Sequence, residues 1–287
     1  MHPISFGTMS LDVGAPTAST RLLHRAVALG LTHFDTADLY DKGENERLVG
    51  KALRPYRQRI RLATKVGNQW RADGSGWDWN PRKAYILRAV DDSLRRLHTD
   101  YIDLYQLHGG TLDDPIDETI EAFERLVEQG KIRAYGISSI RPNVIREWVR
   151  RADLSAVMLQ YSLLDRRSEE AVLDTLAAAN IPVIVRGGVA RGLLVNKTAE
   201  PYLDHDATTV AQAQRAIHAI SDAQRSPAQT ALRYCLRGPA VATVAIGTSN
   251  LSHLETAART PETPPLTETE YAHLREAAPA LTYAKHR

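Results

Sequence analysis

The sequence predicts an α/β protein, and within that class a single (β/α)8 TIM barrel. Three observations support this prediction: eight short β-rich segments run from end to end of the chain, amphipathic helical segments separate them, and most connections are short. Parallel neighbouring strands need helical crossovers, and eight such units close naturally into a barrel. A doubly wound open sheet is the alternative, but "FGTMSLDVG" (6–14) lacks the G-x-G-x-x-G pattern that usually follows the first strand of that fold.

The predicted strands are residues 3–7, 31–36, 59–66, 101–108, 132–138, 155–161, 181–187 and 240–247. No domain boundary is visible, so we expect one barrel domain over residues 1–287. Two connections, 67–80 and 187–209, are longer than usual, and residues from about 260 to 287 read as one more helix and a tail. Both long connections leave the carboxyl end of a strand, where barrels build their active sites.

The helical segments carry their own start and stop signals. Within residues 115–130, apolar side chains recur at three- and four-residue steps and predict one buried face: Ile116, Ile120, Phe123, Leu126 and Val127. Gly130 then stands where a left-handed residue ends a helix. We expect Pro81, Pro142 and Pro227 just inside helix starts, where a missing N–H costs nothing.

The composition excludes several classes of function. Formal net charge is only +2 and no basic cluster occurs, so nucleic acid is not an expected partner. The single cysteine, Cys235, rules out an intrachain disulfide framework and a cysteine-based zinc site, and we expect it to be a buried apolar filler. No 18-residue apolar span and no leader pattern is visible, so we expect a cytoplasmic protein without a membrane partner.

Polar side chains gather at the carboxyl ends of the predicted strands. The second strand ends with Asp35 and is followed by Tyr40, the third ends with Lys65, and the fourth ends with His108. Period-two alternation in "IRLATKV" places Lys65 on the face opposite the apolar one, toward the inside of the barrel. A buried lysine needs a partner, and Asp35 on the neighbouring strand is the expected counter-ion. A purely stabilising ion pair is the alternative interpretation.

Tyr40 and His108 favour a catalytic interpretation. An ammonium near a phenol favours the ionised phenol, so Tyr40 could give a proton to a developing alkoxide. His108, as a neutral imidazole, could orient a carbonyl oxygen or share the proton transfer.

With these residues in view, the chain resembles the aldo-keto reductases. The motifs that carry the resemblance are "GLTHFDTADLYDKGENERLVGKAL", "LATKVG", "YIDLYQLHGG", "GKIRAYGISS", "VMLQYSLLDRR" and "VAIGTSN", in family order over residues 4 to 259. The resemblance implies a catalytic tetrad of Asp35, Tyr40, Lys65 and His108. It also implies NADP(H) bound in extended form, with Tyr40 as general acid and a small-molecule carbonyl compound as substrate.

The resemblance also implies cofactor-binding positions. Ser138 and Gln160 would contact the nicotinamide amide, Ser139 stands where the family usually has asparagine, and Arg186 stands where many members stack a tyrosine. Arg186 could stack on the nicotinamide or reach the pyrophosphate. The remaining expected positions are Gly7, Thr8, Met9, Gly187, Gly247, Thr248, Ser249 and Asn250. Because no cation stands at Ser249, NAD(H) is not excluded.

Loop 67–80 holds three of the four tryptophans, and Trp70, Trp77 and Trp79 are expected substrate walls, with a flap that only packs on the rim as the alternative. A second functional hypothesis is a cofactor-sensing regulatory barrel, similar to potassium-channel β subunits. A metal-dependent hydrolase is disfavoured because no H-x-H or H-x-x-x-H pair occurs, and no metal site is expected. The physiological substrate and the oligomeric state stay open, and a monomer fits the sequence.

Overall fold

The computed structural model describes residues 2–287, which form a closed barrel of eight parallel strands in the order β1-β10-β9-β8-β7-β6-β3-β2. The barrel strands are Ile4–Gly7 (β1), His33–Asp35 (β2), Arg61–Val66 (β3), Leu104–Leu107 (β6), Tyr135–Ser138 (β7), Ala156–Gln160 (β8), Val183–Arg186 (β9) and Val241–Ile246 (β10). Each lies within one of the eight predicted segments. The predicted (β/α)8 barrel is confirmed.

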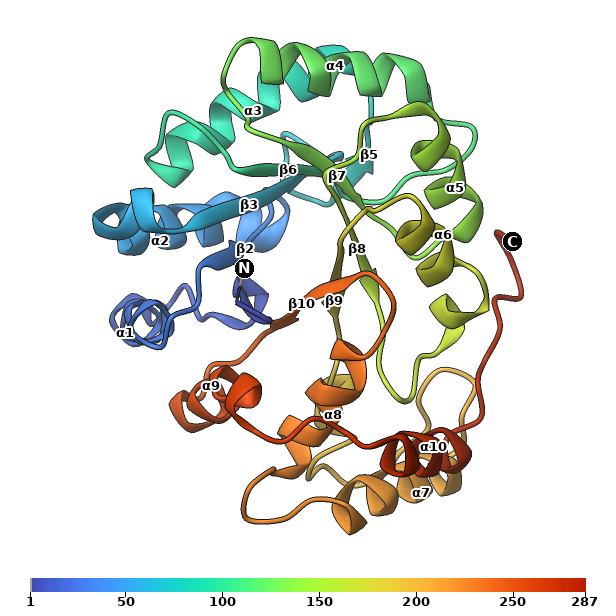
Figure 1. Ribbon diagram of the computed structural model, residues 1–287. Coiled ribbons are helices and arrows are strands. Elements are labelled where there is room, and N and C mark those ends of the chain that lie inside the picture. Colours follow the sequence, from blue (N-terminus) through green and yellow to red (C-terminus); the bar gives the residue numbers. More distant parts are fainter. Residues whose placement is uncertain (1) are drawn as a thin grey trace.

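Helices surround the strands on all sides (Figure 1). They are Pro16–Ala28 (α1), Glu44–Leu53 (α2), Lys83–Leu97 (α3), Ile116–Glu128 (α4), Pro142–Arg151 (α5), Val172–Ala178 (α6), Ala207–Ala219 (α7), Pro227–Leu236 (α8), Leu251–Ala258 (α9) and Glu268–Ala277 (α10). Pro142 and Pro227 begin α5 and α8 as predicted, and Gly130 follows α4 with φ +70°.

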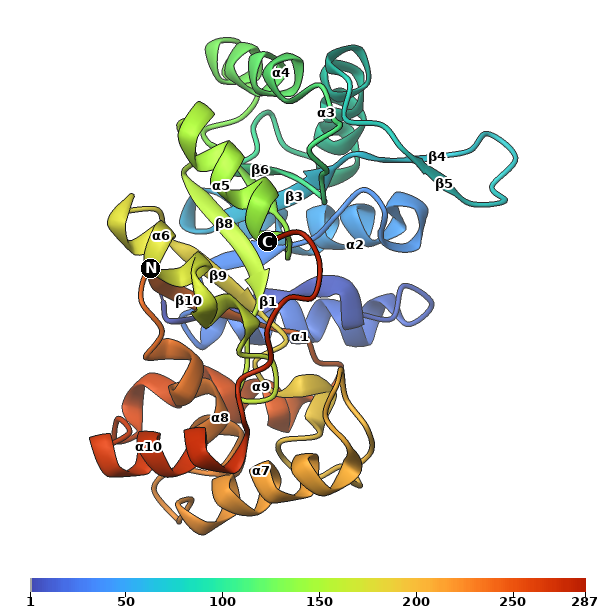
Figure 2. The same cartoon turned by 90° about the vertical axis from the view of Figure 1, so that its right-hand side faces the viewer.

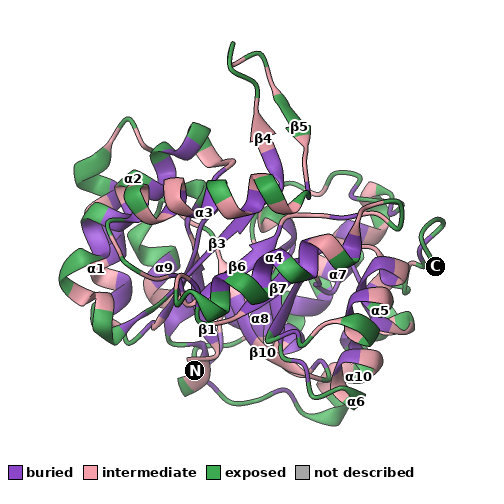
Figure 3. Ribbon diagram, turned by 90° about the horizontal axis from the view of Figure 1, so that it is seen from above, coloured by how far each residue is buried: buried purple, intermediate pink, exposed green. Residues whose placement is uncertain are grey.

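Two layers of apolar side chains fill the structure. The larger layer lies between the strands and the helices, and the burial colours of Figure 3 show it as the inward side of each helix. A small layer inside the barrel consists of Ala63, Leu104, Ala156, Met158 and Ile184. Because side chains alternate along a strand, the same alternation leaves Asp35 and Lys65 facing into the barrel above this inner layer.

The structure corrects four details. Residues 68–70 (β4, Asn68–Trp70) and 77–79 (β5, Trp77–Trp79) pair as an antiparallel hairpin, where the sequence predicted a long connecting loop. This hairpin projects from the barrel (Figure 2). Pro81 lies before α3 rather than inside it, because the chain leaving the hairpin turns into the helix only at Lys83. Val127 is 39% exposed, since it falls beside the buried stripe of α4 rather than on it. The second long connection ends at Asp206, whose carboxylate caps α7.

The C-terminal segment packs back onto the barrel. Arg166 donates hydrogen bonds to the carbonyl oxygens of Arg275 (3.1 Å) and Ala278 (2.7 Å), which fixes the end of α10. Beyond α10 the chain runs along the outside toward α5, where the N–H of Asn143 donates to the carbonyl of His286 (2.9 Å) (Figure 1). The tail thereby reaches the carboxyl ends of the strands.

Candidate active site

Four side chains from three strand ends converge at the carboxyl end of the barrel. Asp35 is the last residue of β2, Lys65 lies one residue before the end of β3, and His108 follows β6 directly. Tyr40 begins the short 3₁₀ turn Tyr40–Gly43 in the connection after β2. The sequence predicted these residues as one group, and the structure brings all four together.

Asp35 and Lys65 form a buried ion pair, with 4% and 1% of each residue exposed. The Lys65 ammonium donates to Oδ1 of Asp35 and to the carbonyl of Thr36 (2.6 Å). Burial by itself lowers the pKa of Lys65, but the Asp35 carboxylate and the Tyr40 phenol outweigh it and hold that pKa above its usual value. Lys65 is therefore a permanent cation inside the barrel.

Tyr40 is the outermost member of this group. The Lys65 Nζ lies 3.4 Å from its hydroxyl oxygen and 5.0 Å from its ring centroid. The chain then passes through three residues with left-handed backbone: Asp41 (φ 48°), Lys42 (φ 56°) and Gly43 (φ 89°). Such conformations are costly for residues other than glycine and are typical of functional sites. This turn sets Tyr40 over the ammonium while keeping it partly exposed.

His108 faces Tyr40 edge to face, with the ring centroids 6.0 Å apart. Burial lowers the pKa of His108 to about 3, and the positive charges of Lys65 and Arg186 add to this effect. The imidazole is therefore neutral at ordinary pH and carries one N–H. Its Nδ1 is buried and has no hydrogen-bond partner within residues 2–287.

The expected nicotinamide contacts lie together on β7, β8 and β9. Ser138 ends β7 and Ser139 follows it, and the Ser139 hydroxyl accepts from the backbone N–H of Arg141 (3.2 Å). Gln160 ends β8, and its Oε1 accepts from Nη1 of Arg186 (2.6 Å). Arg186 ends β9 and is exposed, so its guanidinium lies at the mouth of the barrel.

The predicted positions on β1, β9 and β10 have mixed surroundings. The Thr8 hydroxyl is buried and donates to Oδ1 of Asn45 (2.6 Å), so only its backbone is left for a ligand, while Met9 is 67% exposed. Asn250 caps α9 by accepting from the N–H groups of Ser252 (2.8 Å) and His253 (3.2 Å). Gly7, Gly187, Gly247, Thr248 and Ser249 lie at the same end of the barrel, at or just beyond strand ends.

The three predicted tryptophans all belong to the β4–β5 hairpin but differ in their contacts. Trp79 packs over Gly67 and Gly109, where an added Cβ would meet its ring, and its indole N–H donates to Asp114 (2.9 Å). Trp79 therefore anchors the hairpin. The ring centroid of Trp70 lies 5.2 Å from Nζ of Lys42, in the turn that follows Tyr40, whereas its cross-strand partner Trp77 is 47% exposed.

Sequence reasoning missed a group of supporting residues around the site. Gln106 donates from Nε2 to the second oxygen of Asp35 (2.9 Å). Asp165, which is fully buried, accepts from Nε2 of Gln160 (2.7 Å) and from Arg167. These contacts join residues on different strands and loops, and only the three-dimensional register brings them together. The available signal is the amide of Gln106 between Tyr105 and Leu107, inside the buried strand "LYQL".

The donor set fits a nicotinamide cofactor. The Gln160 amide and the Ser138 hydroxyl offer partners for a carboxamide at neighbouring strand ends. The Gln160 amide is held in place by Asp165, which accepts from its Nε2, and by Arg186, which donates to its Oε1. The exposed Arg186 guanidinium offers a positive charge and a flat surface at the same place. An anionic dinucleotide with an aromatic amide at one end is compatible with all three.

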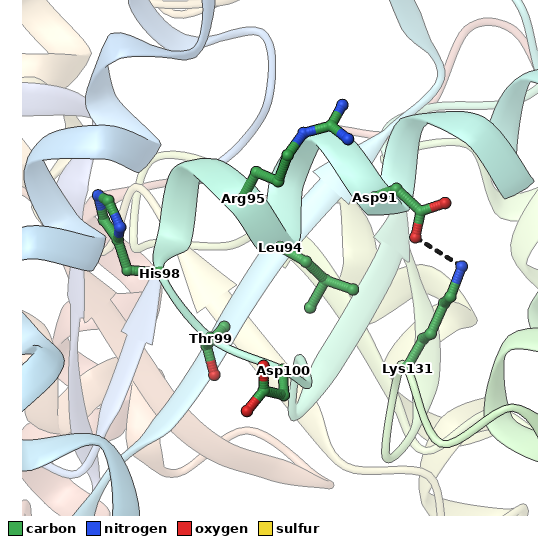
Figure 4. A pocket seen from close by; sticks show the side chains of 7 residues that line it. All are labelled: Asp91, Leu94, Arg95, His98, Thr99, Asp100 and Lys131. Carbon is green, nitrogen blue, oxygen red and sulfur yellow. Dashed lines mark hydrogen bonds and ion pairs between the residues drawn. The ribbon is translucent and has the colours of Figure 1, made fainter.

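A separate surface hollow lies at the other end of the barrel and contains none of these residues (Figure 4). It is formed around the connection between α3 and β6, where Asp91 and Lys131 form an ion pair at 2.5 Å. Its lining residues are Asp91, Leu94, Arg95, His98, Thr99, Asp100 and Lys131. Because residues 98–100 precede β6, this hollow faces the amino ends of the strands.

Two kinds of structural feature are absent from residues 2–287. None of the helices in this range is both long enough and apolar enough to cross a membrane. Across the same residues, no three side chains among His, Cys, Asp and Glu come together in a way that could hold a metal ion.

Known proteins match this chain over nearly its whole length. Residues 3–279 match the model of the Aldo/keto reductase family. The uncharacterized oxidoreductase YqkF of Bacillus subtilis is 44% identical, over 99% of this chain and 95% of YqkF. The holo form of aldo-keto reductase AKR11C1 from Bacillus halodurans superposes with a TM-score of 0.93 at 48% identity, covering 99% of this chain and 95% of that one.

A more distant solved structure is a complex with NADP. It is an aldo/keto reductase from Klebsiella pneumoniae in complex with NADP and acetate, with a TM-score of 0.80 at 28% identity. The match covers 99% of this chain and 94% of the Klebsiella chain.

Proposed function

Because the chain belongs to the aldo/keto reductase family of oxidoreductases, we propose that it reduces an aldehyde or ketone to the alcohol with NADPH, using Tyr40 as the proton donor. The observation that carries this proposal is the line of contacts from Asp35 through Lys65 to Tyr40, beside a neutral His108. These contacts connect the buried Asp35–Lys65 ion pair to the partly exposed hydroxyl of Tyr40.

Tyr40 gives its proton to the carbonyl oxygen as negative charge develops there. The phenolate that is left behind faces the Lys65 ammonium, whose Nζ lies 3.4 Å from the phenol oxygen. At that distance and an effective dielectric constant near 20, the attraction is about 5 kcal/mol before desolvation is subtracted. Asp35 keeps Lys65 charged, so it supports the proton transfer without touching the substrate.

His108 orients the carbonyl group. As a neutral imidazole it can donate one N–H to the substrate oxygen without competing with Tyr40 as an acid. An imidazolium at this place would repel Lys65 and Arg186, whose charges already lower the pKa of His108. Burial, together with the two cations, thus keeps the imidazole of His108 neutral.

The reduced nicotinamide supplies the hydride. Ser138 and Gln160 are the residues that would hold its carboxamide. Arg186 belongs at the nicotinamide end rather than at the pyrophosphate, because its Nη1 is bonded to Gln160 (2.6 Å) and its charge acts on His108. A guanidinium held in this way can stack on the nicotinamide ring. The Klebsiella relative, described with NADP, supports NADPH as the cofactor.

The proposal is tested by following an isotope. The protein is mixed with NADPH deuterated at C4 and with 4-nitrobenzaldehyde, and the alcohol is analysed by mass spectrometry and NMR. We expect deuterium on the benzylic carbon and one alcohol for each NADPH consumed. NADH is assayed in parallel, with a fluorescence titration of both cofactors. Tight NADPH binding without any reduction of the aldehyde would contradict the proposal and favour a cofactor-sensing barrel.

A further inference from the structure

A buried amide contacts the catalytic carboxylate from inside the barrel. Gln106 lies on β6, directly across from Lys65 on β3 in the strand register, and its side chain is fully buried. Its Nε2 donates to Oδ2 of Asp35 at 2.9 Å, while Lys65 donates to Oδ1. The two oxygens of Asp35 therefore have separate donors from two neighbouring strands.

This division matters for the protons of Lys65. An ammonium group has three N–H bonds, and Lys65 directs them to three acceptors: Oδ1 of Asp35, the carbonyl of Thr36 (2.6 Å) and the hydroxyl of Tyr40 (3.4 Å). The Tyr40 contact is the longest of the three. If Oδ2 of Asp35 had no donor of its own, the carboxylate could turn both oxygens toward Lys65 and draw the third proton away from Tyr40.

The chemistry of Gln106 suits this task. A neutral amide satisfies the carboxylate without adding charge, so the buried Asp35–Lys65 pair stays neutral overall. Below the amide the interior becomes apolar, with Leu104 and Ala63 as the next side chains on the same two strands. The Oε1 of Gln106 is buried and has no partner in the described part of the chain. An amide held at that cost is more than a filler of space.

We propose that Gln106 is a positioning residue for the reduction: its amide holds Asp35 in a one-oxygen contact with Lys65 and thereby reserves one ammonium proton for Tyr40. The inference rests on the proposed function, because it acts through Tyr40 as the proton donor. Gln106 itself contacts neither substrate nor cofactor in this account.

Two substitutions separate this role from simple packing. Gln106→Leu removes the donor and puts an apolar side chain of similar size in its place. We expect kcat to fall about tenfold to a hundredfold, the scale of one lost hydrogen bond to a charged group. The Kd for NADPH, measured by fluorescence titration, stays within about twofold, because no cofactor contact changes.

Gln106→Glu gives a signature that packing cannot produce. The protonated carboxyl can still donate to Asp35, but the ionised form cannot, and it repels Asp35. Burial and the Asp35 carboxylate raise the pKa of this carboxyl group above its usual range, and they outweigh the Lys65 ammonium on β3, which acts in the opposite direction. We expect kcat relative to wild type to be close to one at about pH 5.5 and to fall at least tenfold by about pH 8.5.

The control is Thr243→Val on β10, which removes another buried polar group without touching Asp35; its hydroxyl has no partner among residues 2–287. This variant keeps kcat within about twofold. Circular dichroism and Tm show whether each variant is folded. If Gln106→Leu does not fold, the pH series of Gln106→Glu decides alone.

The outcomes distinguish the two proposals. If wild type reduces the aldehyde and Tyr40→Phe does not, but Gln106→Leu keeps wild-type kcat or Gln106→Glu follows the wild-type pH profile, the positioning role is wrong and the proposed function stands. If wild type reduces no carbonyl compound at all, the proposed function is wrong and the inference falls with it.

Discussion

Two of the charge clusters in residues 2–287 differ in how they end. One is Asp35–Lys65 at the mouth of the barrel. The other is centred on Glu169, in the short 3₁₀ turn Arg167–Glu170 after β8. Glu169 accepts from the hydroxyls of Tyr161 (2.9 Å) and Tyr234 (2.8 Å) and from Arg166 (3.0 Å).

The Glu169 cluster is closed. Arg166 also donates hydrogen bonds to the carbonyl groups of Arg275 and Ala278. The contacts of this cluster therefore end on other parts of the fold. Burial alone would raise the pKa of Glu169, but hydrogen bonds from Arg166, Tyr234 and Tyr161 outweigh it and lower that pKa. The cluster fastens α10 to the barrel.

The Asp35 cluster is open. Its contacts lead outward to the hydroxyl of Tyr40, which is partly exposed, and to the His108 ring. Buried charge is common to both clusters, so burial alone does not indicate catalysis. The difference is that one cluster ends on a group that can meet a substrate, whereas the other ends on backbone carbonyls.

The largest expected effect comes from matched changes of one tyrosine in each cluster. Tyr40→Phe should lower kcat by about 10²- to 10⁴-fold, the usual contribution of a general acid, with little change in Tm. Tyr234→Phe should leave kcat within about twofold and cost about 1–3 kcal/mol of unfolding free energy, because a buried hydrogen bond to Glu169 is lost. Kinetics and thermal unfolding of both variants check this, and equal effects on kcat would break the comparison.

A smaller effect distinguishes the clusters by pH. The pKa of His108 is lowered from 6.5 to about 3, so between these values the unfolded chain binds a proton that the folded chain does not. Stability is therefore full above about pH 6.5 and falls on acidification, by about 2 kcal/mol from pH 7 to pH 5. Burial also lowers the pKa of His33, which adds to the loss in the same direction.

The Glu169 cluster behaves differently, because the stability from a lowered carboxyl pKa is lost only as pH falls below 4.5 and through the lowered value. Urea unfolding at pH 7 and pH 5 measures the His108 contribution. His108→Gln should reduce the difference in unfolding free energy between pH 7 and pH 5 by about 2 kcal/mol. The matched substitution His253→Gln, at an exposed position, should leave this difference unchanged. A wild-type slope that His108→Gln leaves unchanged would argue against a buried neutral imidazole.

The open cluster could be predicted from the sequence, and the closed one could not. Asp35, Lys65 and His108 lie at or directly after strand ends. In a parallel barrel the carboxyl ends of all strands lie on one rim, so the positions of these residues in the sequence already imply that they are close in space. Glu169 contacts Tyr161, Tyr234 and Arg275, which lie directly after β8, in α8 and in α10, up to 106 residues away along the chain. Nothing in the pattern of these helices indicates which of their faces meet.

Similar reasons explain the other differences. The hairpin of β4 and β5 has strands of only three residues each, too short for a clear alternation, so its residues read as a loop. The contact between Gln106 and Asp35 depends on the register of β2, β3 and β6, which is fixed by the barrel as a whole. Residue types at strand ends were predictable, but pairings between side chains were not.

The central claim is that Lys65 acts through Tyr40, and a double-mutant cycle tests it most directly. Lys65→Met and Tyr40→Phe are made singly and together, and kcat for reduction of 4-nitrobenzaldehyde is measured on folded protein. If Lys65 serves only to stabilise the phenolate of Tyr40, Lys65→Met should lower kcat strongly in the wild-type background and by no more than about twofold in the Tyr40→Phe background. A double mutant whose fold-loss in kcat equals the product of the two single fold-losses would contradict the account, because Lys65 and Tyr40 would then act independently.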